Sequence, residues 1–382
     1  MTGHIRKRGD AWELRVYVGV DAVTGKKRYA TKSIRGGKRD AERALVELAA
    51  DAQRGKLSRT NTTVAELLDA WFDQASQDFS PKTVVETRGF IDRNLRPALG
   101  TVPLTRLKAA DLDRYYTRLL KNGGQAGQPL SPATIRRIHG ILRRALQQAV
   151  RWGWIGANPA ASASPPRVNA PEIRPPRPDE VADLFRAVGD DPEFAAYLML
   201  SAISGARRSE VIALRWTDIE LEHASMTIRR AIVVGPNGLV EKDTKTHSVR
   251  RVALDAGTVQ MLAGYRDYIH TRADQCDVEL RPDCLVFATD VEMLTPCYPD
   301  SVSRRFRRAC ERAGVEGVRL HDLRHYVATR LLSAGVDVRT VAGRLGHRDA
   351  ATTLNVYSHF VPEADRQAAE ILGGLHVISP PE

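Results

Sequence analysis

Hydrophobic residues along the chain follow two different periods, and the change between them divides the sequence into segments. Residues 12–18 alternate between apolar and polar side chains, and this period of two predicts a half-buried strand. A Thr-Gly turn follows at 24–25, and residues 26–34 predict a second strand. Small and apolar residues then recur at helical spacing over 41–52, so the N-terminal segment is expected to be a small sheet with one helix.

The next hundred residues, 63–157, carry helical patterns with clear starting points. Thr63 and Glu66 form a capping box, in which each side chain accepts a backbone N–H from the other end of the first turn. Ser80 and Ser131 each precede a proline at a first helical position. These features predict an all-helical domain.

The helix predicted from residue 132 to residue 152 has two distinct faces. Its buried stripe is expected to be Ile135, Ile138, Leu142, Ala145 and Ala149. Its basic face is Arg136, Arg137, Arg143 and Arg144, which recur seven residues apart. Because acidic residues are scarce on this helix, we expect the arginines to contact phosphate groups; a solvated charged face is the alternative.

A proline-rich segment separates the helical region from the rest of the chain. Residues 158–178 hold seven of the twenty prolines, which predicts a stiff, extended linker that would let two lobes close around a duplex. Beyond it, residues 226–234 and 249–254 predict two strands around the turn at 236–238. The helices expected there cover 179–188, 194–204, 209–216, 301–313, 323–334, 338–345, 351–357 and 362–375.

The composition fits two or three domains with a polyanionic partner. The chain has 382 residues, is 43% hydrophobic and carries a net charge of +11, which favours nucleic acid as the partner. Its first sixty residues hold fifteen Lys and Arg against seven Asp and Glu. This basic sheet-and-helix segment is typical of a DNA-groove reader; a charged appendage with no target is the alternative.

Several classes of protein are disfavoured by the sequence. No run of about 18 apolar residues and no signal peptide is evident, so we expect no membrane span and a cytoplasmic location. Cys276, Cys284, Cys297 and Cys310 form no C-x-x-C pair, so free thiols and no metal site are expected. No cofactor is expected either.

The candidate chemistry is cleavage of a phosphodiester without a metal ion. That reaction needs cations to neutralise the phosphorane oxygens, a nucleophile, and a proton for the leaving 5′ oxygen. Six residues of suitable type are Arg207, Lys245, His321, Arg324, His347 and Tyr357. The two arginines suit a phosphate clamp, and Tyr357 suits the nucleophile. Lys245, on the loop of the predicted hairpin, and the two histidines suit proton transfer.

Each of these residues also has an ordinary structural interpretation. Arg207 would be a surface charge, and His321 with Arg324 would resemble a pair at a helix start. His347 would be a helix C-cap residue and Tyr357 a core aromatic. The joint occurrence of all six in one order is what favours a catalytic site.

The order and local framing of these residues resemble the tyrosine recombinases of the phage-integrase family. The segments that carry the resemblance are Ser204-Gly205-Ala206-Arg207-Arg208-Ser209-Glu210, Lys245-Thr246, Leu320-His321-Asp322-Leu323-Arg324-His325, Leu345-Gly346-His347 and Thr352-Thr353-Leu354-Asn355-Val356-Tyr357-Ser358-His359. The segment from Ser131 to Pro159 resembles the family's core-binding domain, and the N-terminal segment resembles the arm-type DNA-binding domain of lambda-type integrases.

The resemblance implies a multidomain α+β protein. An arm-type DNA-binding domain of β-sheet plus helix would occupy 1–55, and a helical core-binding domain 63–157. After the linker at 158–178, a mainly helical catalytic domain with a small antiparallel sheet and a C-terminal tail would occupy 179–382.

The activity implied is site-specific recombination that integrates or excises a phage or mobile element. Tyr357 would form a 3′-phosphotyrosyl link, and Arg207, Lys245, His321, Arg324 and His347 would assist it. The implied partners are double-stranded attachment sites of core and arm type, and a homotetramer assembled on DNA. Whether a host DNA-bending protein and an excisionase take part stays open, as does which histidine acts as general base.

One local ambiguity and three rival functions remain at this point. Arg208 stands where the family usually has an apolar residue, so either Arg207 or Arg208 could be the clamp, with spacing from Gly205 favouring Arg207. A topoisomerase of type IB would share the chemistry but relax a single duplex. A DNA-binding regulator would not need Tyr357. A metal nuclease is disfavoured because no acidic cluster accompanies these segments.

Overall fold

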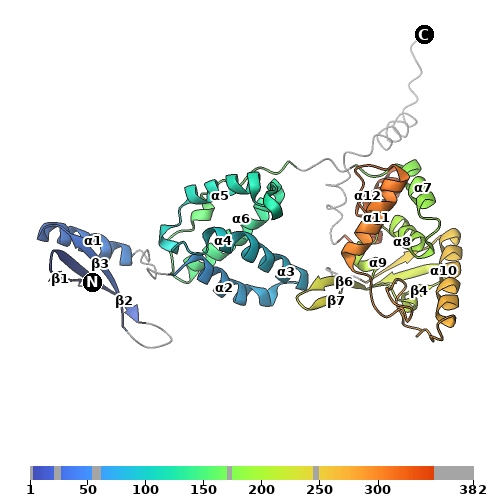
Figure 1. The fold of residues 1–382 in the computed structure, drawn as a ribbon, viewed down its shortest axis with the longest axis horizontal. Helices are drawn as coiled ribbons and strands as arrows, with labels where there is room; N and C mark the ends of the chain where they lie inside the picture. Colours follow the sequence, from blue (N-terminus) through green and yellow to red (C-terminus); the bar gives the residue numbers. More distant parts are fainter. Residues whose placement is uncertain (1–2, 21–26, 54–61, 170–173, 244–248, 348–382) are drawn as a thin grey trace, which may run out of the picture. The chain divides into compact units, whose positions relative to one another are not determined.

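A computed structural model describes residues 3–20, 27–53, 62–169, 174–243 and 249–347 of the chain. Contacts divide it into two units, residues 1–170 and 171–382, and each is described by itself. The mixed helical and antiparallel-sheet architecture confirms the predicted multidomain α+β class (Figure 1). Lys245, Tyr357, the turn at 24–25 and the helices expected over 351–357 and 362–375 lie outside the described residues.

The chain begins with a three-stranded antiparallel sheet covered by one helix. Its elements are β1 (Gly3–Arg8), β2 (Ala11–Val20), β3 (Lys27–Arg35) and α1 (Lys38–Gln53), and β2 is the central strand. Leu14 and Val16 of β2 are fully buried against Ala41 and Leu48 of α1. The sequence predicted only two strands here. β1 was not predicted because Ile5 is its single large apolar residue, so its sequence does not alternate between apolar and polar side chains. This strand forms through its backbone pairing with β2.

Helices make up the rest of the first unit. They are α2 (Val64–Ala75), α3 (Pro81–Phe90), α4 (Arg96–Leu99), α5 (Ala109–Asn122) and α6 (Pro132–Arg151), with a π-helical turn at Ile91–Leu95 between α3 and α4. The predicted starts of α2, α3 and α6 are confirmed, including the reciprocal capping box of Thr63 and Glu66. The predicted stripe of α6 is confirmed too, since all five of its residues are fully buried.

The proline-rich segment is only partly an extended linker. Pro159–Ala161 forms a short 3-10 turn, and Ala160 is buried in the core of the helical region. Further along, Ser164 donates its backbone N–H to Asp113 of α5 over 2.7 Å. The prediction of an unpacked segment from residue 158 was therefore wrong for its first residues, because Asn158 caps this turn and pins it beside α6.

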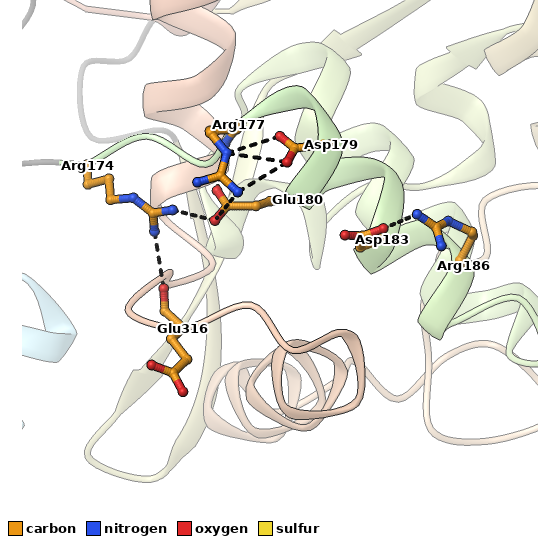
Figure 2. Close-up of polar contacts among 7 residues, drawn as sticks. All are labelled: Arg174, Arg177, Asp179, Glu180, Asp183, Arg186 and Glu316. Atoms are coloured by element: carbon orange, nitrogen blue, oxygen red, sulfur yellow. Dashed lines mark hydrogen bonds and ion pairs between the residues drawn. The ribbon is translucent and has the colours of Figure 1, made fainter.

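The far end of the same segment is tied to the second unit (Figure 2). Arg174 donates to the backbone carbonyl of Glu316 over 3.3 Å and also pairs with the carboxylate of Glu180. The backbone N–H of Arg177 donates to that same carboxylate over 2.8 Å, while its side chain reaches Asp179. Burial raises the pKa of the Glu180 carboxyl, but these donors outweigh burial and hold the pKa below its ordinary value. The path of the chain into the helix that begins at Pro178 is thus fixed.

The second unit is mainly helical. Its helices are α7 (Pro178–Ala187), α8 (Pro192–Ser204), α9 (Arg208–Val211), α10 (Ala256–Asp274), α11 (Pro299–Ala313), α12 (Asp322–Ser333) and α13 (Val338–Leu345). Its strands are β4 (Ile219–Glu220), β5 (Ser225–Ile228), β6 (Arg230–Gly235), β7 (Gly238–Asp243) and β8 (Arg250–Ala253). One large core joins most of these elements, and α8 supplies much of it, because it is apolar on nearly every side. A smaller cluster joins α12 to α13.

Strand pairing in this unit agrees with the prediction only in part. Residues 250–253 pair with β5, which is the first part of the strand predicted over 226–234. The rest of that predicted strand is β6, which pairs with β7 around the expected turn at 236–237. The sequence did not anticipate β7, whose residues Gly238–Asp243 are partly buried or exposed. Lys245 falls between β7 and β8 in the sequence, outside the described residues.

Two helices of this unit also differ from expectation. The helix expected over 209–216 ends at Val211, because the following residues turn into the core, where the N–H of Val286 donates to Leu214 O over 2.8 Å. The long helix α10 was not predicted, although its buried residues Leu262, Tyr265 and Ile269 do follow helical spacing. The other helix predictions over residues 179–345 are confirmed within two residues at their starts.

Candidate active site

The site is built around a glycine turn at the end of α8. Gly205 has a φ of 61°, and a Cβ added there would lie 2.4 Å from Leu345 Cδ2 of α13. Only glycine tolerates both the left-handed conformation and this close approach. The turn exposes the carbonyl of Gly205 to Arg324 of α12, which donates to it through Nη1 over 2.7 Å. The ends of three helices are thereby drawn together.

Arg207 follows this turn and is held by a buried carboxylate. Its backbone N–H and its Nη1 donate to the two oxygens of Glu210 over 2.9 and 2.8 Å, and its Nη2 reaches Gly346 O at 3.4 Å. The Glu210 side chain is 2% exposed, whereas that of Arg207 is 34% exposed. The guanidinium is thus anchored on one side and accessible on the other, as a phosphate clamp requires.

Arg208 faces a different part of the molecule. Its Nη1 donates to Ser303 Oγ over 2.5 Å and lies 3.4 Å from Asp300, both at the start of α11. Of the two arginines left open by the sequence, Arg207 is the one beside Glu210 and the Gly346 turn. This placement agrees with the spacing from Gly205.

The start of α12 contributes two more of the predicted residues. His321 is the N-cap of this helix, and Arg324 lies one turn later with only 4% of its surface exposed. The rings of His321 and His325 pack edge to face with their centroids 5.1 Å apart. Asp322 is buried and accepts three hydrogen bonds from Arg319, which fixes the first turn of the helix.

His347 is positioned by the end of α13. The helix stops at Gly346, whose φ of 70° ends the α-helical path, and the N–H of His347 donates back to Ala342 O over 2.9 Å. This is the hydrogen-bond pattern of a Schellman cap. The capping interpretation is therefore right for the backbone of His347, and the same turn presents its imidazole to the arginines.

The histidines are held in their neutral form. Burial, followed by the charges of Arg324 and Arg207, lowers the pKa of His347 to about 4. Burial and the neighbouring His321 lower the pKa of His325 to about 4 as well. Burial and Arg324 lower the pKa of His321. At neutral pH these imidazoles can accept protons, and they add no charge beside the arginines.

A histidine titration of the DNA-free protein tests this electrostatic arrangement. We expect the NMR signals of His325 and His347, assigned by loss in His325→Gln and His347→Gln, to stay those of neutral imidazole down to about pH 5. Because the unfolded chain protonates these groups near its ordinary pKa of about 6.5, stability should fall as pH drops from there toward 4. Midpoints near 6.5 in the folded protein would contradict this account.

The structure thus brings Arg207, His321, Arg324 and His347 together. The remaining two candidates, Lys245 and Tyr357, lie outside the described residues. Sequence reasoning missed Arg250 of β8, which is 7% exposed and donates to Glu210 over 2.5 Å. Its only sequence signal is the basic pair Arg250-Arg251 at the start of a strand.

Two searches of the described residues add to this picture. No cluster of three or more His, Cys, Asp and Glu side chains suited to a metal ion occurs among the residues that the structure describes. Within the same residues, no helix combines the length and apolar character needed to cross a membrane.

Two family models match the chain. The model of the phage integrase family covers residues 177–363, and that of the phage integrase N-terminal SAM-like domain covers residues 63–120. A tyrosine recombinase XerC-like protein of Caldanaerobacter subterraneus subsp. tengcongensis is 25% identical over 343 residues, which is 83% of this chain and 84% of the relative. The ICEBs1 integrase of Bacillus subtilis is 21% identical over 95% of this chain and 97% of its own length.

Solved structures share the fold. The Tn1549 transposon integrase in complex with transposon right end DNA superposes with a TM-score of 0.65 at 18% identity, over 81% of this chain and 99% of that one. The lambda integrase tetramer bound to a Holliday junction gives a TM-score of 0.60 at 17% identity, over 92% of this chain and 94% of that one.

Proposed function

Because the chain belongs to the phage integrase family and is a site-specific tyrosine recombinase, we propose that it integrates and excises a mobile element through a 3′-phosphotyrosyl link on Tyr357. The proposed substrates are two double-stranded attachment sites, joined in a homotetramer. The proposed setting is the bacterial cytoplasm, at the nucleoid.

The observation that carries the proposed mechanism is the meeting of Arg207 and Arg324 with neutral histidines at the end of α8. Two guanidiniums can neutralise the non-bridging oxygens as the phosphorane forms. Neutral imidazoles can take up a proton, which charged ones cannot. This combination suits phosphoryl transfer to a tyrosine, whose pKa of about 10 requires that its proton be removed.

The proposed steps balance as follows. The Tyr357 oxygen attacks the scissile phosphorus and loses its proton to a histidine, while the bond to the 5′ oxygen breaks and that oxygen receives a proton from Lys245. The phosphotyrosyl bond conserves the energy of the broken phosphodiester, so rejoining needs no ATP. A 5′ hydroxyl of the partner duplex then attacks the phosphorus of the link and gives its proton to Lys245. The bond to the Tyr357 oxygen breaks, and the protonated histidine returns a proton to that oxygen.

A basic groove on the helical domain supports DNA contact by this domain. It has a volume of about 740 Å³ and lies between α3 and α6. Its lining includes Arg137, Arg143, Arg144 and Arg151 of α6 together with Thr83 and Thr87 of α3. Arginines and hydroxyls are the usual donors to phosphate oxygens. We therefore assign residues 63–157 the role of core-site binding.

The N-terminal sheet supports a second DNA site. The face of β2 opposite α1 carries Arg15 and Tyr17, and Tyr29 of β3 lies beside them. The guanidinium of Arg15 sits 3.9 Å from the centre of the Tyr29 ring, and the Tyr17 and Tyr29 rings pack edge to face at 5.7 Å. An exposed basic and aromatic sheet face can enter a groove of DNA, so we assign residues 1–55 to arm-type sites.

Arg15→Ala tests the arm-type assignment. If Arg15 contacts a phosphate, its loss should weaken binding to arm-type DNA and reduce the slope of log K against log salt by about 1. Arg43→Ala removes the same charge from α1, on the covered side of the sheet, and should change the binding little. Equal effects of the two substitutions would show that only net charge matters and would remove the assignment.

The experiment that tests the whole proposal is recombination between two plasmid-borne attachment sites in the presence of EDTA. We expect recombinants only when both sites are present. Relaxation of any supercoiled plasmid without two sites would favour a topoisomerase, and site binding without strand cleavage would favour a regulator. The same assay with and without added DNA-bending protein and excisionase would show whether such partners are required.

A further inference from the structure

We infer that Arg250 is a positioning residue, which holds both the Arg207 guanidinium and the turn before His347 in place. This inference rests on the proposed function. Arg250 opens β8, which pairs with β5. Its side chain is 7% exposed, so the guanidinium is almost wholly removed from solvent. It forms hydrogen bonds with Glu210, 40 residues earlier in the sequence, and with Arg344, 94 residues later.

The first contact of Arg250 is shared with Arg207. Arg250 Nη2 donates to Glu210 Oε2 over 2.5 Å, and the same oxygen accepts the backbone N–H of Arg207 over 2.9 Å. The other oxygen, Oε1, accepts Arg207 Nη1 over 2.8 Å. Glu210 therefore bridges the two arginines. Without Arg250, this buried carboxylate would lose a strong donor on one side, and its hold on Arg207 would change.

The second contact is with the end of α13. Arg250 Nε donates to Arg344 O over 3.0 Å, which satisfies one of the terminal carbonyls that a helix leaves without an internal partner. A Cβ added at Gly346 would lie 2.7 Å from Arg250 Nη1, so the guanidinium packs directly against the turn that precedes His347. Gly346 O also accepts Arg207 Nη2 at 3.4 Å. The two contacts thus meet at the same turn.

Only a planar, forked cation can make both contacts together. A lysine keeps the positive charge but has a single nitrogen at the end of its chain, so it can serve either Glu210 or the carbonyl of Arg344 with proper geometry, not both. A glutamine has one donor group and no charge. The positive charge of Arg250 also contributes to the lowered pKa of His347, which gives the role a signature in pH dependence.

The test compares Arg250→Lys and Arg250→Gln in the full-length protein. A nicked attachment-site duplex serves as substrate, and formation of the covalent adduct is followed at saturating DNA from pH 5 to 9. We expect both variants to bind DNA with wild-type affinity and to form adduct on the order of 100-fold more slowly, because small displacements of aligned groups reduce rates by such factors. In Arg250→Gln the acid limb of the pH profile should move to higher pH.

Arg305→Gln is the matched control. Arg305 of α11 is partly buried and pairs with Asp191 over 2.7 Å and with Glu193 over 2.6 Å, at the start of α8 rather than at the end that holds the site. Its loss should lower the melting temperature and leave the adduct rate of the folded protein and its pH profile unchanged. Arg250 and Arg305 variants therefore separate positioning from general stability.

The outcomes are distinguishable. If the wild-type protein forms no covalent adduct on a DNA site that it recombines, the proposed function itself would be contradicted. If the wild-type protein forms the adduct, and folded Arg250→Lys and Arg250→Gln form it with the wild-type rate and pH profile, the inference alone would be overturned. Loss of DNA binding in step with rate, or failure of both variants to fold, would show a binding or structural role and would overturn it as well.

Discussion

Tyr357→Phe is expected to abolish strand cleavage while leaving DNA binding intact. The substitution removes one oxygen, which under the proposed mechanism is the nucleophile. Loss of the nucleophile should lower the cleavage rate by a factor on the order of 10⁴ or more. The measurement is recombination and adduct formation on nicked attachment-site DNA, with binding followed separately by fluorescence anisotropy.

Tyr268→Phe provides the control for this substitution. Tyr268 lies on α10 and is 38% exposed, so the same oxygen is removed at little structural cost. Its cleavage rate should equal that of the wild type. Recombination by Tyr357→Phe at more than a few per cent of the wild-type rate would assign the nucleophile to another residue.

Glu210→Ala is expected to be the most destabilising single substitution at the site. Glu210 is 2% exposed and accepts hydrogen bonds from Arg207 and Arg250. Removing this carboxylate leaves the buried guanidinium of Arg250 without its negatively charged partner. Breaking a buried ion pair by removing one partner costs about 3–5 kcal/mol of unfolding free energy. Urea unfolding at neutral pH measures the loss, and adduct formation should fall with it because Arg207 loses its anchor.

The control for this prediction is another glutamate in an ion pair with arginine. Glu220 pairs with Arg251 over 2.7 Å, but both side chains are about half exposed. Exposed pairs contribute about 0.2–1 kcal/mol, so Glu220→Ala should change stability far less.

The carboxyl of Glu210 has a pKa below its ordinary value because Arg250 and Arg207 outweigh the effect of burial. Its contribution is therefore present at neutral pH and lost as pH falls through that lowered pKa. Equal losses from both substitutions would contradict the role given to Glu210.

Local features of the fold could be predicted from the sequence. The caps at Thr63, Ser80 and Ser131 depend on side chains within one helical turn, and all three were found as expected. The buried stripe of α6 follows from its spacing alone. Such features need no knowledge of distant parts of the chain.

Features set by distant contacts could not be predicted. The strand predicted over 226–234 is divided into β5 and β6, and only β5 pairs with residues 250–253, because strand pairing is decided by packing on the core. The run Val211, Ile212, Ala213 and Leu214 is buried throughout, so its pattern does not reveal that the helix ends at its first residue. Ala160 gives no local sign that the proline-rich segment packs.

The same distinction applies to the candidate site. Arg207, His321, Arg324 and His347 could be proposed because short sequence segments frame each of them. Arg250 could not, because its partners are distant in sequence and lie on two other elements. Its role becomes visible only when the ends of α8 and α13 are brought together.

The most direct test of the account is to identify the amino acid that becomes linked to DNA. The adduct formed on a nicked attachment-site duplex is digested with trypsin and nuclease, and the nucleotide-bearing peptide is sequenced by mass spectrometry. Cleavage after Arg348 and Arg366 yields a peptide in which Tyr357 is the only tyrosine. The account predicts a 3′-phosphonucleotide on Tyr357. A nucleotide on any other residue, or no covalent adduct on a site that the protein recombines, would contradict it.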